Sequence, residues 1–135
     1  MRAVILAGGR GTRLLPYTIV IPKPMLPLGE MPVIEIISRQ LKFHGFNEVI
    51  VSLGYMGPVI ENFLKAHQND PKLPSLKFFT EDQPIGTSGV IPLLFEEASE
   101  KDLLVINGDV ITTLNLKEMY ERHQARRSIL TIAIR

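Results

Sequence analysis

Five short apolar runs, rich in β-branched and aromatic residues, recur along the chain. They cover residues 4–6, 48–53, 76–80, 103–106 and 128–134. The first of them, Val4-Ile5-Leu6, has no polar face, which predicts a strand buried on both sides, as in a parallel sheet. We therefore expect each of the five runs to form a strand.

The segments between these runs have the residue spacing of amphipathic helices. In residues 32–43, the side chains of Ile34, Ile37 and Leu41 fall on one apolar face, and Gly45 follows the end of the pattern. Helices are also expected over about 58–66, from the 85–90 region to about 98, and over 117–127. Because strands and helices alternate throughout, the pattern predicts an α/β fold with a mainly parallel sheet and right-handed crossovers.

The composition narrows the possible functions. The 135 residues are 45% hydrophobic, which is enough for the core of one domain, and the net charge of +1 gives no general affinity for polyanions. We therefore expect no nucleic-acid partner. The absence of cysteine excludes disulfides, thiolate zinc sites and cysteine nucleophiles, and it suits the cytoplasm. No apolar run approaches the roughly 18 residues of a membrane span, so no membrane partner is expected.

A glycine-rich, basic loop follows the first predicted strand. Gly8, Gly9 and Gly11 permit positive φ angles and the close approach of a ligand. Arg10 and Arg13 add the planar guanidinium that suits phosphate oxygens. The loop lacks both the Walker string and the third glycine of a dinucleotide fingerprint. It is typical of another kind of phosphate-binding loop, although three glycines alone would also fit an ordinary turn.

A lysine flanked by prolines follows this loop. Pro22 and Pro24 fix φ and bias the preceding residues toward extended structure. We therefore expect Lys23 to lie outside any helix, with its ammonium group at the end of a stiff segment.

Ligands of open α/β sheets bind beyond the carboxyl ends of the strands. Three predicted strand ends carry suitable residues, in segments 7–13, 81–89 and 107–109. Asp109 is a candidate Mg²⁺ ligand, because Mg²⁺ takes one or two carboxylates together with phosphate oxygens and waters. An ordinary turn residue is the alternative for Asp109. A phosphate-binding loop at the same sheet edge favours the metal.

The strings Gly-Gly-Arg-Gly-Thr-Arg-Leu (8–14) and Pro-Lys-Pro-Met-Leu-Pro-Leu (22–28) together resemble the signature of the sugar-1-phosphate nucleotidylyltransferases. The style of the motifs is most similar to the mannose-1-phosphate guanylyltransferases. The resemblance implies a Rossmann-like, three-layer α/β/α domain of the GT-A-like type. It also implies transfer of a nucleoside monophosphate from an NTP to a sugar 1-phosphate, with release of pyrophosphate.

The resemblance further implies roles for individual residues. Arg13 and Lys23 would be the catalytic pair, with Arg13 on the β- and γ-phosphates and Lys23 on the α-phosphate and the incoming sugar phosphate. Asp109 would hold the Mg²⁺ cofactor. The nucleotide-binding residues would be Leu6, Ala7, Gly8, Gly9, Gly11, Thr12, Arg13, Glu81, Gly86 and Thr87.

Three positions depart from the commoner family pattern, and one of them bears on the base. Leu15 stands where many relatives have arginine, and Ser88 replaces the usual alanine of Gly-Thr-Ala-Gly. Glu81 stands where uridylyl- and thymidylyltransferases often have glutamine. A carboxylate only accepts hydrogen bonds, which suits the N1–H and amino donors of guanine. We therefore expect GTP as the nucleotide, although Glu81 would also fit an ordinary surface acid after a strand. For the sugar, the resemblance implies mannose 1-phosphate.

Other functions of the same kind of fold stay open. A uridylyl- or thymidylyltransferase acting on glucose 1-phosphate is one alternative, and a non-catalytic subunit that senses nucleotide or sugar is another. An NAD-binding Rossmann domain is disfavoured, because no acidic residue follows the second predicted strand.

The resemblance covers only about the first half of family members. We expect residues 1–135 to be the N-terminal, nucleotide-binding part of a single nucleotidyltransferase domain, without its sugar-binding half. This piece alone is expected to bind NTP weakly, if at all, and to lack turnover. An exposed sheet edge could pair with a second copy, so a homo-oligomer is a further possibility.

Overall fold

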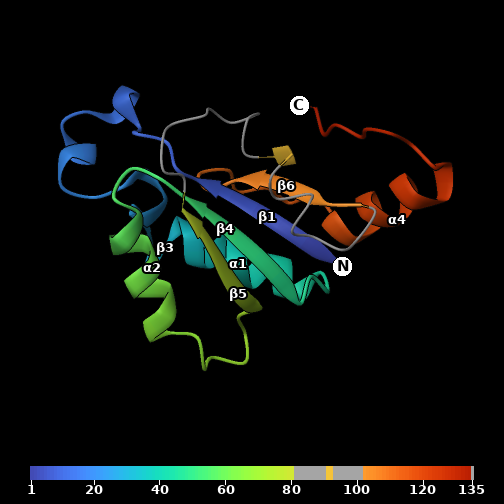
Figure 1. Cartoon of the computed structure of the whole chain (residues 1–135), viewed down its shortest axis with the longest axis horizontal. Coiled ribbons are helices and arrows are strands. Elements are labelled where there is room, and N and C mark those ends of the chain that lie inside the picture. Colours follow the sequence, from blue (N-terminus) through green and yellow to red (C-terminus); the bar gives the residue numbers. More distant parts are fainter. Residues whose placement is uncertain (81–90, 93–101, 135) are drawn as a thin grey trace.

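The computed structural model describes residues 1–80, 91–92 and 102–134. Its centre is a four-stranded parallel sheet with the strand order β5-β4-β1-β6 (Figure 1). The α/β class, the parallel sheet and four of the five predicted strands are confirmed. The four strands are β1 (Arg2–Ala7), β4 (Glu48–Leu53), β5 (Ser75–Thr80) and β6 (Leu104–Asn107).

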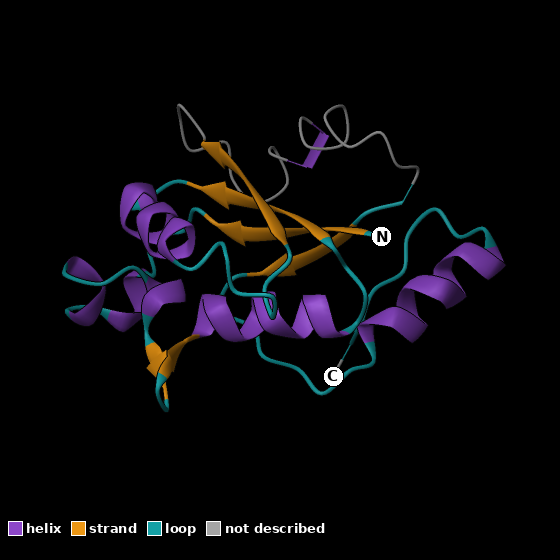
Figure 2. Cartoon of the chain, turned by 90° about the horizontal axis from the view of Figure 1, so that it is seen from below, coloured by secondary structure: helices purple, strands orange, loops and turns teal. Residues whose placement is uncertain are grey.

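Three helices pack on one face of this sheet, and their bounds agree with the predicted ones to within one residue. They are α1 (Val33–Phe43), α2 (Gly57–Ala66) and α4 (Leu116–Arg126), and Figure 2 shows α1 running along the strands. Alternate strand residues such as Ile5 and Val51 meet fully buried helix residues such as Ile37 and Leu64. The predicted helix that ends near residue 98 lies outside the described residues, except for the helical pair 91–92.

The opposite face of the sheet carries a second, smaller apolar cluster. Val4 and Ile50 are buried there, and Leu6, Phe79 and Ile91 pack against them among the residues that are described. Both faces of β1 are therefore covered by apolar side chains, as the uninterrupted run Val4-Ile5-Leu6 predicts.

A long connection between β1 and α1 contains short helical turns and a small hairpin. The turns are η1 (Thr12–Leu14), η2 (Tyr17–Ile19) and η3 (Lys23–Met25), and the hairpin strands are β2 (Pro27–Leu28) and β3 (Met31–Pro32). This connection lies at the carboxyl end of β1 (Figure 1). It is the part of the fold that carries the predicted phosphate-binding loop and Lys23.

Ion pairs join neighbouring elements at the amino ends of the strands. Arg2 Nε lies 2.7 Å from Glu48 Oε2, and Lys77 Nζ lies 2.6 Å from Glu48 Oε1, so one carboxylate links β1, β4 and β5. The hydrogen bond from Lys77 is the main cause that holds the pKa of Glu48 below its ordinary value, with a further contribution from Arg2.

A second network at the same end of the sheet joins α1 to the loop before β5. Arg39 donates from Nε and Nη2 to Glu35 Oε1, at 2.9 and 2.7 Å, and from Nη2 to Asp70 Oδ2 at 2.7 Å. Glu35 is only 5% exposed. Asp70 also accepts the backbone N–H of Lys72 at 2.8 Å, and this bond is the main cause that lowers the pKa of Asp70.

The predicted fifth strand at residues 128–134 is wrong. The structure assigns no strand to this segment, and the side chains of Ile129 and Ile134 are 102% and 92% exposed. A strand requires a ladder partner, and none of the described strands pairs with this segment. Its β-branched composition is therefore not matched by a place in the sheet.

Across the described parts of the chain, no helix combines the length and the apolar character that crossing a membrane requires.

Candidate functional site

The order of the strands marks one position at the carboxyl edge of the sheet. From β1 the chain continues outward to β4 and β5, whereas β6 lies on the other side of β1. The direction in which successive strands are added to the sheet thus reverses at β1, and the point of reversal lies between β1 and β6. In open α/β sheets, ligands bind in the crevice at such a point. The two strand ends are in register, because Leu6 lies opposite Asn107 and the Gly108 N–H donates to Leu6 O at 2.8 Å.

The glycine-rich loop begins at this point. Of the three glycines that permit a positive φ in this loop, only Gly11 adopts one, of 63°. A Cβ atom at Gly11 would lie 2.9 Å from Thr18 Cγ2 and 3.1 Å from Lys23 Cβ. The lack of a side chain at Gly11 therefore allows Lys23 to pack directly against the loop.

Gly9 has a different environment. It is exposed, and a Cβ atom there would have no heavy atom within 4 Å among the described residues. Its backbone is therefore open to a ligand, whereas Gly11 is needed for packing within the protein.

Lys23 lies within a helical turn, contrary to the prediction. It begins η3, which follows Pro22 in an extended conformation (φ −64°, ψ 143°). Pro24 is compatible with this turn because the first N–H groups of a helix have no acceptor inside it. The turn directs Lys23 toward β6, where its ammonium group donates to Asp109 Oδ2.

This ion pair joins two residues that lie 86 positions apart in the sequence. The side chains of Lys23 and Asp109 are 34% and 29% exposed, so solvent reaches both partners. Partly exposed ion pairs contribute at most about 1 kcal/mol to stability. The pair is therefore weak enough to be exchanged for a bound ligand.

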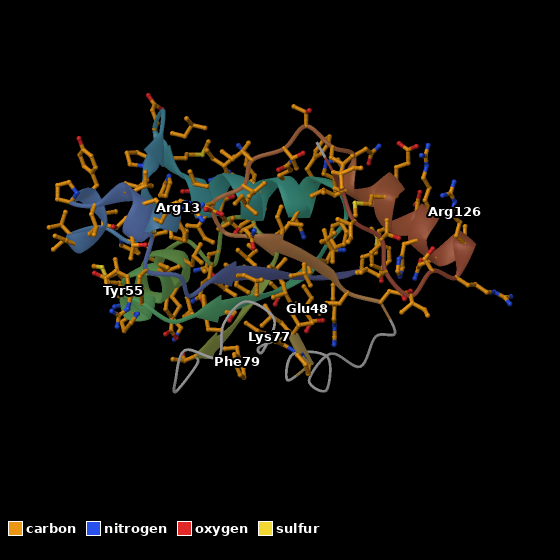
Figure 3. The ribbon with its side chains drawn as sticks, turned by 90° about the horizontal axis from the view of Figure 1, so that it is seen from above. Arg13, Glu48, Tyr55, Lys77, Phe79 and Arg126 are labelled. Carbon is orange, nitrogen blue, oxygen red and sulfur yellow. The ribbon has the colours of Figure 1, made fainter. Side chains whose placement is uncertain are left out.

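The other cations of the loop have no such partner. Arg10 and Arg13 are exposed, and neither forms an ion pair with any residue that the structure describes. Arg13 lies in η1 at the same end of the molecule as Tyr55, far from Arg126 (Figure 3). Among the described residues, Arg10, Arg13 and Lys23 thus give this edge two positive charges more than Asp109 neutralises, which favours an anionic ligand.

The other predicted site residues fall into two groups. Leu6 and Ala7 belong to β1, where Ala7 is buried, and Thr12 is exposed at the start of η1. Glu81, Gly86 and Thr87 lie outside the described residues. The structure therefore brings together the glycine loop, Lys23 and Asp109, and it leaves the predicted base-binding segment untested.

Two residues of this edge were not predicted from the sequence. A Cβ atom at Gly54 would lie 2.7 Å from Gly8 O, so glycine is required for β4 and the loop to approach this closely. The next residue, Tyr55, donates its N–H to Gly8 O at 3.0 Å and its hydroxyl to Thr18 O at 3.1 Å. The available signal was that each of two predicted strands is closely followed by a glycine, Gly8 after residues 4–6 and Gly54 after residues 48–53.

The donor set at this edge fits a magnesium ion that is shared with phosphate. Asp109 offers one carboxylate, and the described residues contain no group of three or more His, Cys, Asp or Glu side chains able to hold a metal. Mg²⁺ commonly binds through one or two carboxylates and completes its shell with phosphate oxygens and waters. A site of this kind would bind the metal together with an anionic ligand.

Comparisons with known proteins agree with this geometry. The family described as nucleotidyl transferase matches residues 2–135. The D-glycero-alpha-D-manno-heptose 1-phosphate guanylyltransferase of Aneurinibacillus thermoaerophilus is 34% identical over 135 residues, which are 100% of this chain and 57% of that protein. Mannose-1-phosphate guanylyltransferase 1 of Arabidopsis thaliana is 36% identical over 128 residues, 93% of this chain and 35% of that protein. The chain thus spans between about a third and somewhat more than half of these relatives.

Solved structures give the same result for the fold. HddC from Yersinia pseudotuberculosis, also solved in complex with GMP-PN, has a TM-score of 0.80 at 32% identity, over 90% of this chain and 53% of that one. A Bacillus anthracis structure assigned as a glucose-1-phosphate thymidylyltransferase has a TM-score of 0.81 at 29% identity, over 94% of this chain and 51% of that one.

Proposed function

Because the chain belongs to the nucleotidyl transferase family, we propose that it supplies the nucleotide-binding part of a sugar-1-phosphate guanylyltransferase. The whole protein would transfer GMP from GTP to a hexose 1-phosphate, with mannose 1-phosphate favoured, and would release pyrophosphate. The observation that carries this proposal is the ion pair between Lys23 and Asp109 beside the glycine loop, at the point where the strand order reverses.

The proposed reaction is a direct displacement at phosphorus. An oxygen of the sugar 1-phosphate forms a bond to the α-phosphorus of GTP. The bond from that phosphorus to the oxygen that bridges to the β-phosphate breaks, and its electron pair leaves with pyrophosphate. Such chemistry depends mainly on positioning and on charge neutralisation, so it requires no covalent nucleophile from the protein.

Three charged residues of the site would do this work. Arg13 would bind the β- and γ-phosphates and neutralise the charge that develops on pyrophosphate. Lys23 would bind the α-phosphate and orient the incoming sugar phosphate. Asp109 would hold Mg²⁺, which when bound supplies positive charge to the phosphate oxygens. In the free protein, Lys23 and Asp109 neutralise each other.

The preference for guanine has two supports. The relatives at 34% and 36% identity are guanylyltransferases, and the Yersinia pseudotuberculosis neighbour was solved with GMP-PN. The carboxylate of Glu81 would accept the N1–H and amino hydrogens of guanine. The Bacillus anthracis neighbour favours a second candidate, a thymidylyltransferase acting on glucose 1-phosphate.

The predicted cytoplasmic location rests only on the cysteine-free sequence.

The test is a thermal-shift panel of GTP, ATP, CTP, UTP and dTTP, each with and without Mg²⁺, on a protein of the family's full length. We expect GTP with Mg²⁺ to stabilise the protein most, since a ligand at 100 times its Kd adds about 2.7 kcal/mol. The matched variant Asp109→Asn should lose the Mg²⁺-dependent part of the shift. Stronger stabilisation by UTP or dTTP would overturn the guanine assignment.

Turnover is tested separately, on a protein of the family's full length. Pyrophosphate release from GTP and mannose 1-phosphate is the expected result. Tight GTP binding without pyrophosphate release from any sugar 1-phosphate would instead identify a sensing subunit.

A further inference from the structure

Tyr55 makes two hydrogen bonds to the connection that carries the glycine loop. Its backbone N–H donates to Gly8 O at 3.0 Å, where the loop leaves β1. Its hydroxyl donates to Thr18 O at 3.1 Å, ten residues further along the same connection. The connection is therefore bonded to one residue at two points, to the backbone N–H of Tyr55 at Gly8 and to its hydroxyl at Thr18.

From Thr18, a further hydrogen bond leads into the glycine loop itself. Thr18 is buried, with 1% of its surface exposed, and its hydroxyl donates to Gly11 O at 3.1 Å. Gly11 in turn packs against the side chain of Lys23. A continuous set of contacts thus leads from Tyr55 through Thr18 and Gly11 to the lysine that binds Asp109.

Tyr55 is itself firmly placed by the turn between β4 and α2. The Gly57 N–H donates to Gly54 O at 2.9 Å, which closes a tight turn around Tyr55. Met56, the residue before α2, adopts a left-handed conformation with φ 53°, which a residue with a side chain rarely adopts. Strained backbone of this kind persists only where the surrounding structure fixes it.

We propose that Tyr55 is a positioning residue of the nucleotide site, which sets the path of the glycine loop through its hydrogen bonds to Gly8 and Thr18. This inference rests on the proposed function for its ligand. Tyr55 does not touch the phosphates; it fixes the loop backbone that does. A loop held before binding loses less conformational freedom when the triphosphate arrives, and the affinity is correspondingly higher.

The test uses Tyr55→Phe, which keeps the ring and the backbone hydrogen bond and removes only the hydroxyl. Tyr120→Phe is the matched control, because the Tyr120 hydroxyl also donates to a backbone oxygen, Asp102 O at 3.2 Å, beside α4. Both variants lose a bond of the same type. We expect similar small decreases in Tm for the two.

Two measurements distinguish positioning from general stability. Amide hydrogen exchange in residues 8–18 should accelerate in Tyr55→Phe and stay unchanged in Tyr120→Phe. The dissociation constant for GTP with Mg²⁺ should rise about three- to tenfold in Tyr55→Phe alone, as expected for the loss of one hydrogen bond. Thr18→Val should weaken GTP binding too, and the double variant should show less than the product of the two effects, because both act on the same loop.

Unchanged exchange in residues 8–18 would overturn the inference, as would equal effects of the two tyrosine variants on GTP binding. If a protein of the family's full length with Tyr55 unaltered binds no nucleotide, the proposed function fails. The exchange measurement then still decides whether Tyr55 positions the loop.

Discussion

The two edges of the sheet use charge in opposite ways. At the amino edge, Glu48 is paired with Arg2 and Lys77, and Arg39 is paired with Glu35 and Asp70. At the carboxyl edge, the described residues form a single ion pair, Lys23–Asp109, while two arginines of the glycine loop are without one.

Backbone contacts fix the glycine loop at the carboxyl edge. At the carboxyl edge, Gly8 and Gly54 touch, and Tyr55 bonds the loop. The charged residues of the amino edge are paired with one another, whereas the glycine loop carries an excess of positive charge on a backbone that hydrogen bonds and close packing fix. The difference between the edges is therefore a guide to function, and substitutions at each edge can test it.

The largest effect is expected at the amino edge, from Arg39→Met. This change leaves the buried carboxylate of Glu35 without its guanidinium, and breaking a buried pair in this way costs about 3 kcal/mol. The free energy of unfolding, measured with urea, should fall by that amount. Nucleotide affinity should be unchanged, and a large loss of GTP binding in a folded Arg39→Met protein would contradict the distinction between the edges.

Gly54→Ala should give the next largest effect. The added methyl group would lie 2.7 Å from Gly8 O and 2.9 Å from Gly8 Cα, so either β4 or the loop must shift. Overpacking of this kind costs about 2 kcal/mol, and GTP binding should weaken as the loop moves. Gly9→Ala is the control for stability, because its methyl group would meet no heavy atom of the described residues within 4 Å. Equal urea midpoints for the two variants would argue against the close approach.

Lys23→Met should change two affinities in opposite directions. In the unaltered protein, Mg²⁺ must displace the ammonium group of Lys23 from the Asp109 carboxylate. Without Lys23 this competition is absent, so Mg²⁺ alone should bind several-fold more tightly. The Kd for GTP should rise about tenfold, because a phosphate contact is lost. Calorimetric titration measures both constants. Lys77→Met removes the same charge at the other edge and should leave both affinities unchanged. If Lys23→Met instead weakened the binding of both Mg²⁺ and GTP, Mg²⁺ would not be replacing Lys23 as the partner of Asp109.

The smallest effect is a dependence of stability on pH that comes from the amino edge. The pKa values of Glu48 and Asp70 are lowered in the folded protein, so their contribution is present above the unfolded carboxylate range near pH 4. It is lost as the pH falls from there through the lowered folded values. In urea unfolding between pH 3 and 7, Lys77→Met should make this acid loss smaller. An unchanged acid slope would show that Lys77 does not stabilise the charged form of Glu48.

Much of the fold could be predicted from the sequence because the parallel sheet buries both faces of its strands. The uninterrupted apolar runs at β1 and β4, and the helical spacing of α1, follow directly from that burial. The meeting of the glycine loop with Asp109 could be expected too, since the carboxyl ends of parallel strands share one edge. Segment 128–134 could not be judged in this way, because strand composition does not reveal whether a partner strand exists.

The finer structure of the site depends on register, which the sequence does not contain. Gly54 lies beside Gly8 only because Ala7 pairs with Leu53 in the parallel ladder. The same register places Tyr55 within reach of Gly8 O. Lys23 was predicted to be near the phosphates but outside a helix, because flanking prolines usually break helices; a single helical turn requires no hydrogen bond that Pro24 would remove.

The sequence separation between Lys23 and Asp109 also has a kinetic consequence. Residues 86 positions apart meet only after the chain has closed a long loop, and such non-local contacts form late and slowly in folding. The site therefore has no local precursor in the unfolded chain and comes into existence when β6 docks beside β1. A nucleotide added during refolding would report the completion of the sheet, rather than the earlier formation of its helices.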